Sequence, residues 1–205
     1  TNYTTGNGLG SNSVLGVYAQ GSTIYAALDG GGVSISTNGG TNWTNYTTGN
    51  GLGSNNVQGI FAQGSTIYAA TDAGVSISTN NGANWTNYTT ANGLGGNFVR
   101  SVYAAGSTVY AAIDGAADGF GGVSISTNSG TSWTNYSVTN GVESQWERVM
   151  GVYAAGGSIY AATFPGVNTA GGLRVSTDNG ASWTGYTTTN GLGSNGVWAL
   201  SLIHI

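Results

Sequence analysis

The stretch Ser36-Thr-Asn-Gly-Gly-Thr-Asn-Trp43 decides the fold, because the chain repeats it. Three further copies end at Trp85, Trp133 and Trp183, which puts 42, 48 and 50 residues between successive tryptophans. The flanking sequence repeats as well, for example as Ser-Thr-Ile-Tyr-Ala-Ala at residues 22–27 and 65–70. A period of this length is typical of proteins built from one supersecondary unit used several times.

Each unit contains four short segments rich in Val, Ile, Tyr and Thr, bounded by clusters of Gly, Asn and Ser. This pattern predicts strands at residues 14–20, 22–28, 33–37 and 43–48, and at the equivalent positions of the later units. A Gln-Gly or Ala-Gly pair between the first two strands favours a tight hairpin. No stretch has helical spacing with start and stop signals.

Units of four antiparallel strands at this period indicate a β-propeller, in which each unit forms one blade. A repetitive β-solenoid is the alternative, although its coils are usually shorter and its strands parallel. We predict an all-β propeller with four complete repeats and partial strands at both ends, as part of an open ring. Residues 1–199 then form one domain, with repeats at about 1–43, 44–85, 86–133 and 134–183 and a partial repeat at 184–199.

The composition excludes several classes of function. The 205 residues include three arginines, no lysine and seven acidic residues, so the chain cannot build the basic surface that nucleic acids require. Without cysteine it has neither thiol chemistry nor disulfides. No apolar run approaches the roughly 20 residues of a membrane span. We expect neither a cofactor nor membrane insertion in this segment.

The repeated stretch resembles the Asp-box (BNR-like) motif of β-propellers, Ser-x-Asp-x-Gly-x-x-Trp. The fourth copy matches it with Asp178, and the others carry asparagine at that position. The chain is also similar to the propeller repeats of bacterial two-component sensors, which have an Asn-Gly-Leu motif before the first strand, as at residues 50–52. The resemblance implies the fold shared by sialidases, other glycoside hydrolases, sorting receptors and photosystem-assembly factors.

In this motif we expect structural roles. The Asp or Asn side chain accepts backbone N–H groups and tolerates a left-handed conformation, glycine supplies a positive φ, and tryptophan fills apolar space between blades. A ligand role for Asp178 is the alternative. The residues assigned to the motif are Ser36, Asn38, Gly40, Trp43, Ser78, Asn80, Gly82, Trp85, Ser126, Asn128, Gly130, Trp133, Ser176, Asp178, Gly180 and Trp183.

In a propeller, the loops after the second and fourth strands share one face, where ligands usually bind. Asp29, Asp72 and Asp114 occupy equivalent positions on that face, and the fourth unit has Phe164 there. These aspartates either cap turns or contribute to a ligand site. Asp114 and Asp118 in a glycine-rich loop form the one candidate for calcium, although their spacing does not match a known calcium loop.

The fourth unit departs most from the repeat, and such departures are where function can be added. The loop before its first strand holds Glu143, Trp146, Glu147 and Arg148. A surface tryptophan beside acidic and basic groups suits stacking on a sugar ring or an aromatic partner. The alternative is a drifted loop whose tryptophan packs back onto the blade.

Catalysis has weaker support. Hydrolysis of glycosides needs two carboxylates, which Glu143, Glu147 and Asp114 could supply, although no spacing demands it. A sialidase-like site needs an arginine cluster. Arg100 and Arg148 begin first strands at positions that we treat as equivalent, and they could converge, whereas Arg174 lies farther out and the arginine motif of that family is missing. A Ser-His-Asp triad would depend on His204 in the C-terminal tail.

The last residues, Leu-Ser-Leu-Ile-His-Ile, resemble the translated adapter end of a shotgun sequencing library. We therefore expect residues 200–205, or 201–205, to be non-native; a diverged strand is the alternative.

Four functions remain open: a non-catalytic binding or scaffold module for a glycan or a protein, secreted, on the cell surface or periplasmic; a fragment of a glycoside hydrolase or sialidase; a self-associating structural repeat; and a periplasmic sensor propeller. The first is our prediction, with Trp146, Glu143, Glu147, Arg148, Asp29, Asp72 and Asp114 as its candidate ligand contacts.

Overall fold

A computed structural model describes residues 2–115, 121–137, 148–165 and 171–200 of the chain. Within these ranges the chain forms four sheets of four antiparallel strands each, joined in sequence order. The first two are β1 (Val14–Gln20), β2 (Thr23–Leu28), β3 (Gly32–Ser36) and β4 (Thr44–Tyr46), then β5 (Val57–Gln63), β6 (Thr66–Thr71), β7 (Gly74–Ser78) and β8 (Thr86–Tyr88). The others are β9 (Val99–Ala105), β10 (Thr108–Ile113), β11 (Gly122–Ser126) and β12 (Thr134–Tyr136), then β13 (Arg148–Ala155), β14 (Ser158–Phe164), β15 (Gly172–Ser176) and β16 (Thr184–Tyr186).

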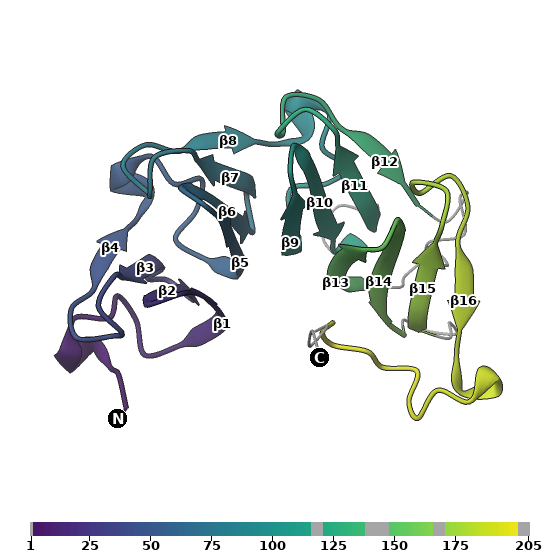
Figure 1. Ribbon diagram of the computed structural model, residues 1–205, viewed down its shortest axis with the longest axis horizontal. Helices are drawn as coiled ribbons and strands as arrows, with labels where there is room; N and C mark the ends of the chain where they lie inside the picture. The colour runs from purple at the N-terminus through teal and green to yellow at the C-terminus, as the bar shows by residue number, and fades with distance from the viewer. Residues whose placement is uncertain (1, 116–120, 138–147, 166–170, 201–205) are drawn as a thin grey trace.

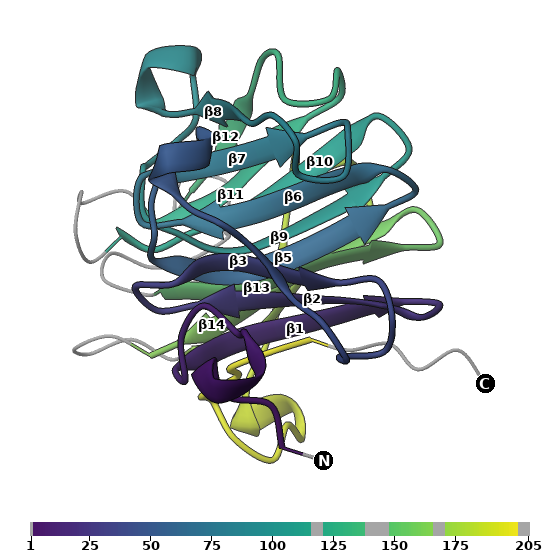
Figure 2. The ribbon, with the colours of Figure 1, turned by 90° about the vertical axis from the view of Figure 1, so that its left-hand side faces the viewer.

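The four sheets are the blades of an open β-propeller, as the sequence predicts. They follow one another around an arc, with the first strand of each blade toward the centre and the fourth at the periphery (Figure 1). Seen from the side, the strands of successive blades are stacked (Figure 2). The innermost strands of neighbouring blades pack against each other, so β1, β5, β9 and β13 form the wall of a central channel.

Short 3₁₀ turns, which the sequence does not predict, precede β1 and follow β4, β8 and β16. They are η1 (Thr5–Asn7), η2 (Thr48–Asn50), η3 (Thr90–Asn92) and η5 (Thr188–Asn190). Each is closed by a glycine of the repeated Asn-Gly-Leu motif with φ between 91° and 96°. That conformation is left-handed and favours glycine, which explains why the motif ends the turn in the same way in these four copies.

The hydrophobic core lies mainly between blades. Buried residues of adjoining blades, such as Val33 of β3 with Val57 and Ile60 of β5, form one cluster. At its outer edge a tyrosine from the fourth strand of one blade packs edge-on against the tryptophan of the next, as Tyr46 does on Trp85 at 6.3 Å between ring centroids. The same contact joins Tyr3 to Trp43 and Tyr88 to Trp133. We call these contacts the Tyr–Trp clasps, and through them three of the tryptophans pack against a tyrosine of the preceding unit.

The motif that decides the fold forms the hairpin between the third and fourth strands. In the first blade the Ser36 hydroxyl accepts the Gly40 N–H at 2.8 Å, and Asn38 Oδ1 accepts the Asn42 N–H at 2.9 Å. The left-handed residue is not the Asp or Asn, as expected, but the one after it: Gly39 (φ 67°), with Asn81, Ser129 and Asn179 in the later blades. Acceptance of N–H groups and the positive φ of Gly40 are as predicted.

A β-bulge interrupts the first strand of every blade. In β1, Val14 pairs with Leu28 and Gly16 with Ala27, so Leu15 is left without a pairing partner. The residues skipped in the same way in the next three blades are Gln58, Arg100 and Met150. A bulge adds one residue to a strand and redirects its side chain, and bulges are frequent beside functional sites.

The end segments are not assigned as strands, although they lie where partial strands are expected. Tyr3 packs on Trp43, as its counterparts do in later blades. At the other end the Val197 N–H donates to the Thr163 carbonyl at 3.3 Å, and Ala199 lies beside Gly151 of β13. Of the tail expected to be non-native, Leu200 lies within the described ranges and residues 201–205 lie outside them.

Candidate functional site

The loops after the second and fourth strands meet at one end of the channel. We call this end the loop face; it comprises residues 8–13, 29–32, 51–56, 72–74, 93–98, 114 and 148. The loops of neighbouring blades are joined there, because the Gly32 N–H donates to the Asn55 carbonyl at 2.8 Å and the Gly30 N–H donates to Asn56 Oδ1 at 2.9 Å. The predicted grouping of these two loop types is thus present.

Asp29, Asp72 and Asp114 are equivalent in the backbone, as the sequence predicts. Their N–H groups donate to the carbonyls of Ser13, Asn56 and Phe98, each one residue before a first strand. Their side chains differ. Asp29 is exposed. Asp72 Oδ2 accepts a hydrogen bond from the side-chain amide of Asn56 at 2.8 Å, and Asp114 is buried, with 2% of its surface exposed. The repeat therefore places three identical groups in three environments.

Two arginines surround the buried Asp114. Arg100 donates from Nε to Asp114 Oδ2 at 2.7 Å, and its Nη2 lies 2.6 Å from the same oxygen. Arg148 lies on the other side, with Nε 3.7 Å from Oδ1. Arg100 also donates from Nη1 to Gln58 Oε1 at 3.3 Å, and its guanidinium lies 4.5 Å from the centre of the Phe98 ring. A buried carboxylate requires such compensation, since an unpaired one would be costly.

The convergence of Arg100 and Arg148 is thus observed, but the expected equivalence of their positions is wrong. Val99 pairs with Ile113 and Val149 with Thr163, so Arg100 follows the first valine of its strand and Arg148 precedes it. Arg100 occupies the bulge, whereas Arg148 corresponds to Phe98. The two meet because both side chains approach one aspartate from neighbouring blades. Arg174 lies in β15, two strands away from β13, as expected.

Several predicted contacts lie outside the described residues: Glu143, Trp146, Glu147 and Asp118. The calcium candidate therefore has only Asp114 within the described ranges, where it is paired with arginine. Gln58 is a contact that the sequence does not indicate, because nothing within its own unit distinguishes it. The available signal was variation, since the residue after the first valine differs in every unit.

A cavity of about 290 Å³ lies in the channel itself. Its wall contains the bulge residue of each first strand and the two residues after it, together with Trp198, Ala199 and Leu200. The rings of Trp198 and Phe164 are 4.5 Å apart, and Trp198 is 64% exposed. Deeper along the same strands, Tyr18, Phe61, Tyr103 and Tyr153 form a ladder with ring centroids 4.4 to 4.8 Å apart.

Burial and a hydrogen bond to Tyr153 raise the pKa of Tyr103 to about 12, with desolvation as the larger cause. In the hairpin of the fourth blade, at the end away from the loop face, hydrogen bonds from Ser182 and then from Ser176 lower the pKa of Asp178 to about 2. These partners belong to the hairpin itself, and they support the structural role of Asp178.

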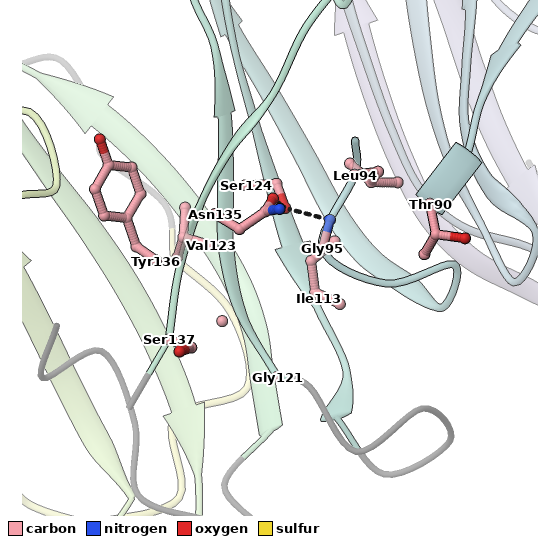
Figure 3. Close-up of a pocket in the computed structure, with 11 residues that line it drawn as sticks. Thr90, Leu94, Gly95, Ile113, Gly121, Val123, Ser124, Asn135, Tyr136 and Ser137 are labelled. Carbon is pink, nitrogen blue, oxygen red and sulfur yellow. Dashed lines mark hydrogen bonds between the residues drawn. The ribbon is translucent and has the colours of Figure 1, made fainter. Parts of the chain in front are cut away.

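A second cavity, of about 360 Å³, lies beside β11 and β12 (Figure 3). Its polar centre is a chain of hydrogen bonds: the Gly95 N–H donates to Ser124 Oγ at 3.1 Å, and Ser124 Oγ donates to Asn135 Oδ1 at 2.7 Å (Figure 3). Ser34 with Asn45 and Ser76 with Asn87 repeat this arrangement in the first two blades. Because it is common to three blades, we assign it to the scaffold.

Comparison with known proteins agrees with the fold. No protein-family model matches the chain, and no curated protein matches it. Solved structures are similar to it: an ancestral GH74 enzyme (24% identity, TM-score 0.65, 83% of this chain and 23% of that one), and the extracellular domain of a hybrid two component system from B. thetaiotaomicron (16%, 0.70, 91% and 26%). YCF48 bound to D1 peptide is a third (13%, 0.61, 87% and 56%).

The chain thus spans about a quarter of the first two structures and about half of the third. At these identities the likeness shows the fold alone, and it is that of a β-propeller. Within the described ranges, no helix is long and apolar enough to cross a membrane, and no three metal-ligating side chains gather in one place.

Proposed function

We propose that this chain is a non-catalytic binding module for a glycan or a protein, and that its ligand contacts the loop face. The observation that carries the proposal is the Arg100–Asp114–Arg148 cluster. Both ion pairs found among the described residues belong to it. It joins two neighbouring blades at the end of the channel, and the Arg148 side chain remains 47% exposed.

The geometry favours binding over acid–base chemistry. The Asp114 carboxylate is occupied by guanidinium groups, which suits it to orient two arginines rather than to exchange protons with a substrate. Arg148 is held by a single long contact and presents a planar fork of donors to solvent. Glu143, Trp146 and Glu147 immediately precede it in sequence, and we propose that they contribute to the same surface.

The similar structures agree with a binding role and with an extracellular, cell-surface or periplasmic location, since they include an extracellular sensor domain and a propeller with a bound peptide. A glycan array and a pull-down from secreted material, both with the 205-residue chain, test the proposal. We expect Arg148→Ala to weaken the captured interaction and Gln63→Ala, an exposed side chain at the end of β5 away from the loop face, to leave it unchanged. No captured ligand, or equal loss in both variants, would refute the proposed surface.

A further inference from the structure

One position of the repeat varies far more than its neighbours. A valine recurs at or next to the start of the first-strand segment in every unit, and the position two after it is glycine, serine or alanine. The residue between them is different each time: Leu15, Gln58, Arg100, Met150 and Trp198. We call these five residues the channel ring.

The bulges explain where these side chains lie. In each of the four complete blades the variable residue is the one that the bulge leaves unpaired. All five residues line the same channel cavity, so the variable position is also the channel position. The repeated scaffold thus presents one variable side chain per blade to a single cavity, which is the arrangement needed to select a ligand.

We infer that the channel ring binds a neutral saccharide, and this inference rests on the proposed binding function. The ring has an apolar sector of Leu15, Met150 and Trp198 and a polar sector of Gln58 and Arg100. A pyranose has the same division, because its C–H face is apolar and its hydroxyl groups are polar. The exposed Trp198, backed by the Phe164 ring, supplies a flat surface for the C–H face.

Charge favours a neutral ligand over an acidic one. Arg100 is the charged residue of the cavity wall, and its guanidinium already faces the Asp114 carboxylate through both Nε and Nη2. Gln58 Oε1 accepts a hydrogen bond from Arg100, so the NH2 group of the Gln58 amide is directed away from Arg100. The volume of about 290 Å³ is at the lower end of the range for ligand pockets, and it suits about one or two sugar rings.

Binding of cellobiose, maltose and lactose to the 205-residue chain, measured by isothermal titration calorimetry and by tryptophan fluorescence, tests the inference. We expect at least one of the three to bind. Trp198→Leu should weaken that binding about tenfold and Gln58→Ala about fivefold, since truncating a contacting group typically costs this much. Tyr186→Leu, an exposed aromatic residue outside the ring, and Gln63→Ala, at the far end of β5, serve as matched controls and should bind as the parent does.

Three outcomes would overturn the inference: none of the disaccharides binds; glucuronate binds while the neutral sugars do not; or the ring variants and the matched controls lose affinity equally. The proposed function fails separately. If the array or pull-down captures a ligand whose binding depends on Arg148 but not on Trp198 or Gln58, the loop face binds and the channel ring does not.

Discussion

Replacing Asp114 by asparagine tests whether the Arg–Asp–Arg cluster stabilises the junction between the third and fourth blades. The substitution keeps the shape and one acceptor oxygen but removes the charge opposite Arg100. Breaking a fully buried ion pair by removing one partner costs about 3–5 kcal/mol. Because the side chains of Arg100 and Arg148 are 25% and 47% exposed, water compensates part of this loss, and we expect about 2 kcal/mol.

For a chain of this length, about 2 kcal/mol lowers the melting temperature by about 4–8 °C. The repeat itself supplies the control, because Asp29→Asn makes the same change at the equivalent, exposed position and should stay within about 0.5 kcal/mol. Thermal unfolding followed by circular dichroism measures both. The reasoning is refuted if the two variants lose the same stability, or if Arg148→Gln costs as much as Arg100→Gln, since the 3.7 Å contact should matter less than the pair of short ones.

Three further substitutions test packing and ionisation. Gly59→Ala should lower the free energy of unfolding by about 1–3 kcal/mol in denaturant titrations, because the added Cβ would lie 3.0 Å from the Arg100 carbonyl oxygen. Gly151→Ala, whose added Cβ would have its nearest contact at 3.6 Å, should cost less. The reverse order would contradict the packing. The pKa of Asp178 is lowered from 3.8 to about 2, so its contribution to stability is present above about pH 4 and is lost as pH falls toward 2. Asp178→Asn should therefore flatten the melting temperature over that interval, and an unchanged slope would refute this. The pKa of Tyr103 is raised from 10.0 to about 12, so stability falls as pH rises between these values. Tyr103→Phe should reduce that fall in alkaline melting curves. No difference from the parent would count against burial as the cause of the raised pKa.

The fold could be predicted because its signals are local and repeated. Alternating β-branched residues and glycine-rich turns indicate strands, and four copies average out the ambiguity of any one. The pattern of residues 14–20, for example, predicts a strand, and these residues form β1. The repeated motif forms the hairpin between the third and fourth strands, and its left-handed residue follows the Asp or Asn; it is a glycine in the first blade and an asparagine or serine in the others.

The site could be predicted only in part. The sequence indicates Asp114 and Arg148 as candidate contacts but does not predict the bulges, because one additional residue in a strand leaves no compositional signal. Without the bulges, Arg100 and Arg148 are aligned to the same position, whereas in the structure Arg100 is the bulge residue and Arg148 precedes the first valine. Gln58 is not predicted for the same reason, because a glutamine in a strand stands out only when its position is compared across the units.

The Tyr–Trp clasps have a consequence for how such a chain grows. Each clasp takes its tyrosine from one unit and its tryptophan from the next, as Tyr46 and Trp85 do. A tandem duplication of any segment one period long therefore creates a complete new contact at the join, with no compensating mutation. The free energy of unfolding then depends on contacts between neighbouring blades, so each added blade raises it by a nearly constant amount. Gene duplication can lengthen such a chain one blade at a time while the channel position of each copy remains free to change.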